Sequence, residues 1–255
     1  MVERRAGILE YIQTKGEVST DELFALFPDK TPKTIRRDLV YLEQAGAILR
    51  SHGSARVNRQ YLLQPEPHYS ERENENSAAK YEIAEYAAKF LGSSRSVFID
   101  AGTTMMALAQ HLPDANLTVL TAAPNIALYI AAKKPTCSVF LTGGNLNPKT
   151  LSCSGYGSME QLKLVNIDVA FMAASGFSQA NGFTVGDHFE CELKRAVISK
   201  AGRTIMLMDS SKIDRSMPFT FARPSDIKTL VGDRELDPAT IAFLRTKGVD
   251  VHKIK

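Results

Sequence analysis

The chain has 255 residues, of which 44% are hydrophobic and 23% are charged, a composition that is ordinary for a soluble globular protein. Its apolar runs fall far short of the roughly 20 residues that a membrane-spanning helix needs, and its first residues lack the apolar core of a secretory signal. The three cysteines lie far apart without metal-ligand spacing, which favours reduced thiols. We therefore expect a cytoplasmic protein with no membrane partner, no metal and no cofactor.

The net charge of +3 is unevenly distributed along the chain. Residues 30–59 hold seven basic and two acidic side chains, a net charge of +5, so the remaining 225 residues carry −2. A basic block attached to a nearly neutral body indicates that one module binds a polyanion.

Three short helices are predicted near the N-terminus. Residues 1–15 carry an apolar stripe at helical spacing. Ser19 and Glu22 match a capping box, which predicts that a second helix occupies residues 20–27. A third helix is predicted over residues 32–44, because a proline stands at its first position.

Two short strands, 47–50 and 55–57, flank a turn and predict a wing, so residues 1–57 form a winged helix-turn-helix. Long bases and hydroxyls on the third helix and the wing suit phosphate and base-edge contacts in DNA. The alternative is that Arg36 and Arg37 merely solvate a helix face; the bases of the wing favour DNA. The candidate DNA-binding residues are Thr31, Lys33, Thr34, Arg36, Arg37, Arg50, His52 and Arg56.

A polar stretch separates this module from the rest of the chain. Residues 58–80 contain two prolines and no apolar periodicity, which predicts a linker. An amphipathic helix follows, up to Leu91, within a larger domain that covers residues 81–255. Its expected strands are 97–100, 117–121, 138–142, 169–173, 204–208, 229–231 and 249–252, and its expected helices are 105–112, 125–133, 190–201 and 238–247.

Alternating strands and helices predict an α/β domain with a mostly parallel sheet that is covered on both faces. Such sheets bind ligands at the carboxyl ends of their strands. Polar motifs stand at four of these ends, in residues 100–104, 142–145, 175–177 and 209–212, and the first three contain glycine.

The first of these motifs is suited to an anion. Gly102 permits a tight turn, and the free N–H groups of the next helix, with the hydroxyls of Thr103 and Thr104, can hold a phosphate. Taken singly, such a motif is more often a helix cap, and Glu190 with Lys194 is more often a solvated i, i+4 pair. The fingerprints of dinucleotide binding and of nucleotide hydrolysis are absent from the sequence.

The N-terminal residues TIRRDL (34–39), with Leu42-Glu43, Gly46 and Arg50–Gly53, resemble the signature of the DeoR family of bacterial transcriptional regulators. The motifs DAGTT, TGG, GF, Glu190 with Lys194, and DSSK occur in that family's order, so the resemblance covers essentially the whole chain. The chain departs from the pattern at Lys30, Ser54 and Ala122-Ala123.

The resemblance implies a small winged helix-turn-helix joined to a larger α/β effector domain, whose fold is shared with ribose-5-phosphate isomerase and glucosamine-6-phosphate deaminase. It further implies a repressor of a carbohydrate-catabolism operon that binds double-stranded operator DNA as a homo-oligomer, a dimer or tetramer, and is released by a phosphorylated sugar or related metabolite. The effector-binding residues that we expect are Asp100, Gly102, Thr103, Thr104, Thr121, Gly143, Gly144, Gly176, Glu190, Lys194, Asp209 and Lys212.

An alternative function stays open at this point. The chain could be a sugar-phosphate isomerase or deaminase with an appended DNA-binding module, in which Asp100 and Glu190 transfer protons and Lys194 stabilises an enediolate. We expect no catalytic residues and no enzyme, because no pair of carboxylates stands out from structural polar residues. Repression and activation are not distinguished by the sequence.

Overall fold

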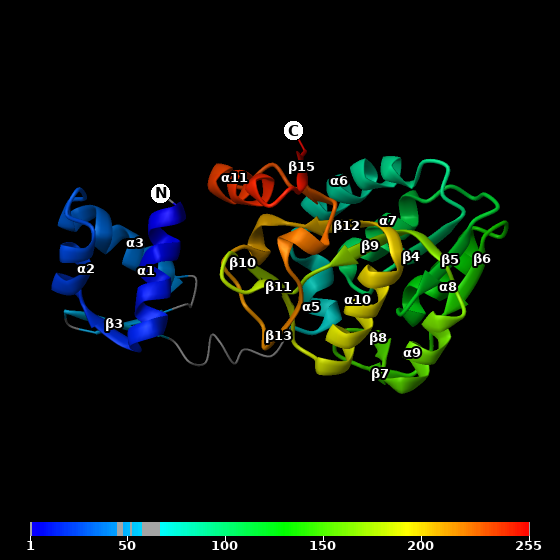
Figure 1. The fold of residues 1–255 in the computed structure, drawn as a ribbon, viewed down its shortest axis with the longest axis horizontal. Helices are drawn as coiled ribbons and strands as arrows, with labels where there is room; N and C mark the ends of the chain where they lie inside the picture. Colours follow the sequence, from blue (N-terminus) through cyan, green and yellow to red (C-terminus); the bar gives the residue numbers. More distant parts are fainter. Residues whose placement is uncertain (1, 45–47, 52, 58–66, 255) are drawn as a thin grey trace. The chain divides into compact units, whose positions relative to one another are not determined.

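The computed structural model describes residues 2–44, 48–51, 53–57 and 67–254, which form two compact units, residues 1–64 and 65–255 (Figure 1). His52 and residues 58–66 of the expected linker lie outside the described residues. Each unit is described by itself below.

The first unit is the winged helix-turn-helix that the sequence predicts. Its helices are α1 (Val2–Lys15), α2 (Thr20–Leu26) and α3 (Pro32–Gln44), and its strands are β1 (Glu17–Ser19), β2 (Ile48–Ser51) and β3 (Ser54–Val57). Both hydrogen bonds of the Ser19–Glu22 capping box are present. The strand β1 was not expected; it pairs with β3 and completes an antiparallel sheet in the order β1-β3-β2. Its core is formed by Ile8, Ile12, Leu23, Ile35, Leu39 and Ile48.

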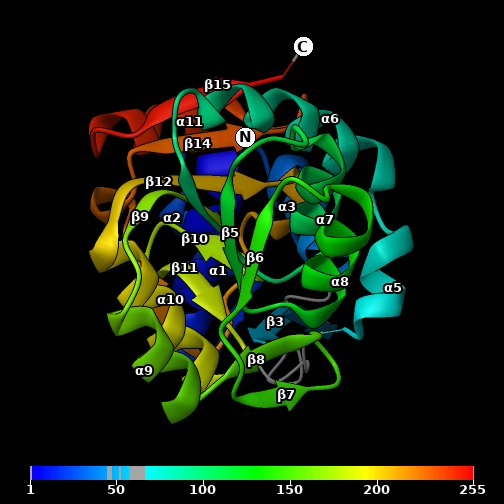
Figure 2. The same cartoon turned by 90° about the vertical axis from the view of Figure 1, so that its right-hand side faces the viewer.

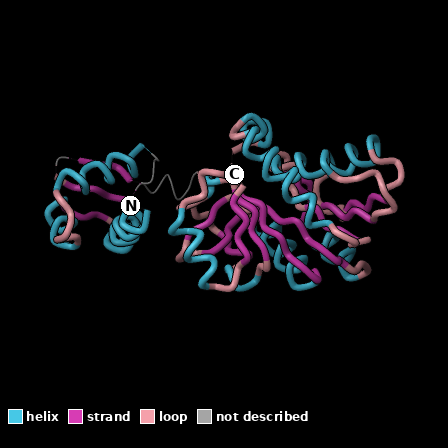
Figure 3. Tube along the Cα trace, turned by 90° about the horizontal axis from the view of Figure 1, so that it is seen from above, coloured by secondary structure: helices cyan, strands magenta, loops and turns pink. Residues whose placement is uncertain are grey.

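The second unit is built on a parallel sheet of seven strands in the order β15-β14-β12-β9-β4-β5-β6. Seen from above, the strands fan out side by side across the unit (Figure 3). This sheet confirms the predicted α/β class. The strands are β4 (Ser96–Ile99), β5 (Thr118–Thr121), β6 (Ser138–Leu141), β9 (Ile167–Ala173), β12 (Ala201–Met208), β14 (Thr229–Gly232) and β15 (Asp250–Lys253).

Helices cover both faces of this sheet (Figure 2). One face carries α6 (Ser77–Ala88), α7 (Thr103–His111) and α8 (Pro124–Lys133); the other carries α9 (Tyr156–Lys163), α10 (His188–Lys200) and α11 (Pro238–Thr246). Side chains alternate between two apolar cores: in β4, Val97 and Ile99 pack with α6–α8, whereas Phe98 packs with α9–α11. No helix within the described ranges is long and apolar enough to span a bilayer.

Several smaller elements surround the sheet; all were unexpected except η1, which lies at the end of the helix expected up to Leu91. They are the hairpin β7 (Asn145–Asn147) and β8 (Ser152–Ser154), the antiparallel sheet of β10 (Gly176–Ser178), β11 (Gly182–Val185) and β13 (Phe219–Ala222), and the short helices α5 (Tyr69–Asn74), η1 (Lys89–Leu91), η2 (Ser210–Lys212) and η3 (Pro224–Asp226).

The second unit begins earlier than the sequence predicts. We expected a linker through residue 80, but α5 and the first turn of α6 occupy residues 69–80 and pack on this unit; for example, the Tyr69 amide donates to the Lys149 carbonyl at 2.7 Å. The buried positions of α6 are Lys80, Ile83, Ala84 and Ala87. This is regular helical spacing, but its first member is a lysine, which conceals the apolar pattern.

Candidate functional site

The candidate site lies where the order of the parallel strands reverses. From β4 the chain continues to β5 and β6 on one side, and then crosses to β9 on the other side of β4. The crossing helices diverge at such a point, so a crevice opens beyond the carboxyl ends of the two central strands. A cavity is found there, with walls that include Ala101, Gly102 and Thr103 after β4 and Ala174 and Ser175 after β9.

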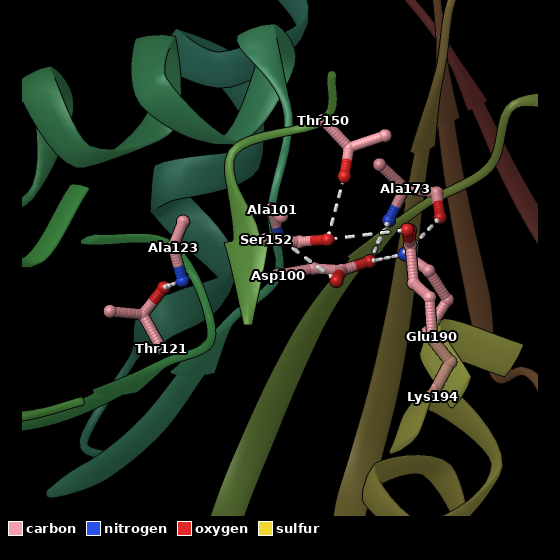
Figure 4. Close-up of polar contacts among 9 residues, drawn as sticks. All are labelled: Asp100, Ala101, Thr121, Ala123, Thr150, Ser152, Ala173, Glu190 and Lys194. Atoms are coloured by element: carbon pink, nitrogen blue, oxygen red, sulfur yellow. Dashed lines mark hydrogen bonds and ion pairs between the residues drawn. The ribbon is translucent and has the colours of Figure 1, made fainter. Parts of the chain in front are cut away.

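The floor of the cavity holds a buried ionic cluster (Figure 4). The Lys194 ammonium on α10 donates to Asp100 Oδ2, to the Ala173 carbonyl at 3.1 Å and lies 3.3 Å from Glu190 Oε1. These three side chains are at most 8% exposed. Buried charges of this kind persist because they are paired and hydrogen-bonded.

Asp100 also joins the two central strands. Its Oδ1 accepts from the Ala101 amide at 2.8 Å, and its Oδ2 accepts from the Ala173 amide at 3.0 Å. The carboxylate therefore fixes the end of β4 against the end of β9, which positions the walls of the cavity.

The hairpin β7–β8 contributes to the same cluster. The Ser152 hydroxyl donates to Glu190 Oε2 at 3.3 Å and lies 2.8 Å from the Thr150 hydroxyl, and both residues are buried. Sequence reasoning missed these two residues because short serine- and threonine-rich turns have no distinctive pattern.

The N-terminus of α7 opens into the cavity. Gly102 is the N-cap and has a φ of 124°, which disfavours any residue with a Cβ. Its missing side chain cannot cap the helix, so the first N–H groups of α7 remain available to an anion. Thr103 and Thr104 line the cavity beside them, as the sequence predicts.

Three basic side chains form a wall that we call the basic wall: Arg72 on α5, Lys80 on α6 and Lys212 on η2. The Lys80 ammonium donates to the Arg72 carbonyl. Burial lowers the pKa of Lys80 and of Lys212 from the ordinary lysine value, although the Asp209 carboxylate opposes this shift. An anion in the cavity would favour the charged form of both lysines.

The cavity therefore brings together most, but not all, of the residues expected from the sequence. The residues that line it are Gly102, Thr103, Thr104, Glu190, Lys194 and Lys212, and Asp100 lies behind the lining, where it accepts from Lys194. Asp209 is behind the basic wall, where its Oδ1 accepts from Asn76 Nδ2 at 3.2 Å. Arg72 and Lys80 were missed, because we assigned their segment to the linker.

Besides Asp100 and Asp209, four further expected effector residues do not line this cavity, and their contacts are within the protein. The Thr121 hydroxyl accepts from the Ala123 amide at 3.1 Å, away from the Lys194 cluster (Figure 4). A Cβ on Gly144 would lie 2.5 Å from the Ser154 carbonyl oxygen, and one on Gly176 would lie 2.6 Å from the Arg215 carbonyl oxygen. Gly143 has a φ of 68°, and its carbonyl accepts from Ser158. Close backbone packing thus accounts for Gly144 and Gly176 without a ligand, and the left-handed backbone conformation accounts for Gly143.

The candidate DNA-binding residues lie on α3 and the wing of the first unit. Lys33, Arg36 and Arg37 are exposed on α3, and the Thr31 and Thr34 hydroxyls lie 2.9 Å apart at its start. Arg50 and Arg56 are exposed on β2 and β3, respectively, with Arg50 lying 3.3 Å from Glu43.

A buried contact that the sequence did not reveal supports α3. Asp38 is 1% exposed and accepts hydrogen bonds from the Arg4 and Arg5 side chains of α1. Burial opposes ionisation, but the hydrogen bonds from the two arginines hold the pKa of Asp38 below its ordinary value. Asp38 therefore faces the core side of α3, and its neighbours Arg36 and Arg37 face solvent.

The chain combines a winged helix-turn-helix unit with an α/β unit that contains a polar cavity at the point where the strand order reverses. This combination defines a class of protein, the DNA-binding transcriptional regulators. The model of the DeoR-like helix-turn-helix domain matches residues 4–61, and that of the DeoR C terminal sensor domain matches residues 75–234. The chain therefore belongs to the DeoR family, and the predicted family and regulatory class are confirmed.

Individual relatives agree with this assignment. The chain is 35% identical to the uncharacterized HTH-type transcriptional regulator YulB of Bacillus subtilis (strain 168), covering 98% of this chain and 96% of the relative. It is 30% identical to the glycerol-3-phosphate regulon repressor of Escherichia coli (strain K12), covering 84% and 83%. Among solved structures, ribose 5-phosphate isomerase A of Methanocaldococcus jannaschii matches with a TM-score of 0.41 and 14% identity, over 54% of this chain and 55% of that one.

Proposed function

We propose that this chain represses a carbohydrate-catabolism operon, and that a phosphorylated sugar bound in the switch-point cavity relieves the repression. The observation that carries the proposal is the combination of the basic wall with the N-terminus of α7 around one cavity. Both features stabilise a bound phosphate, the first through charge and the second through N–H groups.

The floor of the cavity suits the sugar part of such a ligand. Glu190 lines the cavity as a hydrogen-bond acceptor and Ser175 as a hydroxyl group. Their neighbourhood is polar but has no net positive charge, because two carboxylates surround the single ammonium of Lys194. A ligand with a phosphate at one end and hydroxyl groups at the other fits this distribution of charge.

The DNA contacts that we propose are those of the α3 surface and the wing. Thr31, Lys33, Thr34, Arg36 and Arg37 would enter the major groove, whereas the bases of the wing and His52 would contact the adjacent backbone. A single recognition helix reads few base pairs, so a homo-oligomer with paired DNA-binding units would be needed for operator specificity.

Ligand and DNA would be coupled by linkage. The ligand can shift the protein towards a form with low operator affinity only by binding that form more tightly, with coupling typically of about 1–3 kcal/mol. The half-sites of an operator must stay in register with the DNA helix, so a small change in the spacing of paired units weakens binding.

We further propose that the chain is not an enzyme. The alternative function needs Asp100 to exchange protons, but both of its oxygens accept hydrogen bonds from backbone amides, and Lys194 donates to it as well. These contacts give Asp100 a structural role, because they hold the ends of β4 and β9 together. Incubation of the pure protein with pentose and hexose phosphates tests this point, because turnover above a heat-inactivated control would contradict it.

The proposed function is tested by measuring fluorescence anisotropy with DNA from upstream of the chain's own gene and with random duplex DNA. We expect tight, specific binding to the first, which triose, pentose or hexose phosphates weaken and the unphosphorylated sugars do not. Lys212→Met should bind DNA normally and lose the response, whereas Lys228→Met, at an exposed position outside the cavity, should keep it. Equal affinity for both DNAs, or a normal response of Lys212→Met, would contradict the proposal.

A further inference from the structure

The exposed side of α3 carries a tyrosine, Tyr41, in addition to the candidate DNA-binding residues. Tyr41 follows Arg37 by four residues and Lys33 by eight, so the three side chains form a row along the helix. The tyrosine is 50% exposed, and no group within the described residues accepts a hydrogen bond from its hydroxyl. A half-exposed tyrosine has an apolar body and a polar tip, which suits it to an interface.

The ring of Tyr41 is held by α1, which packs beside α3 (Figure 1). The guanidinium carbon of Arg5 lies 3.8 Å from the centre of the ring, which is a close cation–π contact. The Arg5 side chain is only 14% exposed, and its Nε donates to Asp38 Oδ1 at 2.8 Å. Because the buried Asp38 fixes Arg5, the ring that Arg5 covers is restricted as well.

The contact between the two helices has an excess of positive charge. Arg4 and Arg5 both pair with Asp38, so two guanidinium groups share one carboxylate and the net charge is +1. One arginine would be enough to pair with the carboxylate. The excess charge lies directly beside the Tyr41 ring, and Arg37 is one turn away on the same helix, so the surroundings of the tyrosine attract a phosphate.

The dimensions of the major groove indicate what Tyr41 meets when α3 enters it. A helix with its side chains is about 10–12 Å across and the groove is about 12 Å wide, so the helix fills the groove. Side chains on the middle line of the inserted face then meet base edges, and side chains to one side of that line meet the phosphates of the groove wall.

Tyr41 lies to one side of this line. Each step of four residues advances about 40° beyond a full turn, so the row that begins at Lys33 and Arg37 drifts around the helix. The contact with Arg5 shows that it drifts towards α1. Tyr41 is therefore directed at a wall of the groove, where phosphates are the hydrogen-bond acceptors.

We propose that Tyr41 contacts DNA through a hydrogen bond from its hydroxyl to a backbone phosphate, and that Arg5 is the positioning residue that holds its ring. Tyrosine hydroxyls are among the groups that donate to DNA phosphates. A ring that is already restricted loses little conformational freedom on binding, so its hydrogen bond contributes more to affinity than one from a mobile side chain. The inference rests on the proposed function only in that α3 enters the major groove.

The test is fluorescence anisotropy with full-length Tyr41→Phe, which keeps the ring and its contact with Arg5 but lacks the hydroxyl. The DNAs are a fragment from upstream of the chain's own gene and a random duplex. We expect both to bind more weakly by a similar factor, roughly five- to thirtyfold, because every sequence has phosphates. The slope of log affinity against log salt should stay unchanged, since a neutral side chain releases no counterion.

Tyr11→Phe is the matched control. Tyr11 lies on α1 and packs against the core of the first unit, so the loss of its hydroxyl should leave DNA binding like that of wild type. Circular dichroism melts establish that each variant is folded before its affinity is interpreted.

Two further measurements test the position of the contact and the role of Arg5. Ethylation of individual phosphates should interfere with wild-type binding at a set of positions, and Tyr41→Phe should lose one of them for each DNA-binding unit. Arg5→Lys keeps the charge beside Asp38 but has no planar guanidinium to cover the ring. It should weaken binding by wild type and have much less effect in Tyr41→Phe, a difference that a purely structural role of Arg5 would not produce.

Unchanged affinity of Tyr41→Phe would overturn the inference, and so would a loss confined to one of the two DNAs or an ethylation pattern identical to that of wild type. These results leave the proposed function standing if operator binding and its release by sugar phosphates are observed. A uniform loss with the expected ethylation pattern supports the inference even if no sugar phosphate affects DNA binding. A wild type that binds neither DNA would contradict both.

Discussion

Replacing Lys194 with methionine should destabilise the second unit strongly while leaving the DNA-binding unit folded. Methionine matches the length of the lysine stem but removes the ammonium, so Asp100 and Glu190 remain as neighbouring carboxylates, 4% and 8% exposed, without their cation. Breaking a buried ion pair by removing one partner costs about 3–5 kcal/mol. For a unit of this size, that cost lowers the midpoint of thermal unfolding by roughly 6–20 °C.

The assay is thermal unfolding followed by circular dichroism, with Lys228→Met as the control. Lys228 is exposed, so its replacement should change stability by no more than about 0.5 kcal/mol. A triple variant that also carries Asp100→Asn and Glu190→Gln should recover part of the loss, because neutral amides need no counter-charge. If Lys194→Met melts within about 2 °C of wild type, or if the triple variant is no more stable than Lys194→Met, the pairing of these charges is not what holds the cavity floor together.

The remaining predictions concern DNA, pH and backbone packing. Arg36→Ala should cost about 1–3 kcal/mol in operator binding and relax specificity at one position, whereas Arg56→Ala should weaken all sequences alike and reduce the salt slope by about one; anisotropy titrations at several salt concentrations distinguish the two. Burial lowers the pKa of Lys80 and Lys212, so both lysines lose their charge below the ordinary lysine value of 10.5. Isothermal titration with a phosphate monoester should therefore show that affinity falls as pH rises above neutrality, and Lys212→Met should flatten this profile. A flat profile in wild type would remove the lysines from the site. Gly144→Ala should destabilise the protein by about 1–3 kcal/mol through the clash with the Ser154 carbonyl, and an unchanged melting temperature would show that this packing is loose.

The sequence predicts the first unit well because its signals are local. A capping box, a proline at the first position of a helix and a glycine after the last turn each act within a few residues, and Ser19, Glu22 and Pro32 stand where these rules require them. The strand β1 escaped prediction because three residues carry no periodicity; it exists through its pairing with β3, which is distant in sequence.

The sequence predicts the polar motifs at the strand ends of the candidate site. It does not predict which glycines line the cavity, nor does it predict the basic wall. A glycine in a turn indicates that something approaches the backbone closely, but the sequence does not say whether a ligand or the protein does so; Gly102 opens onto the cavity, whereas Gly144 packs against Ser154. From the sequence, Lys80 resembles a solvated residue, as most lysines are. It is buried because it lies on the same side of α6 as Ile83 and Ala84. This helical spacing is recognisable in the sequence only if a lysine is allowed at a buried position.

The position of the basic wall in the chain bears on how a ligand would affect the DNA-binding unit. Arg72 and Lys80 belong to the segment that directly follows residues 58–66, and the Lys80 ammonium is bound to the Arg72 carbonyl at the end of α5. A phosphate near Lys80 would accept a hydrogen bond from the same ammonium, so ligand binding and the placement of α5 depend on the same group. A ligand shifts the equilibrium between two states of a protein only through contacts that differ between those states. The contact between Lys80 and the Arg72 carbonyl, if the ligand alters it, is therefore sufficient to couple ligand binding to the position of α5.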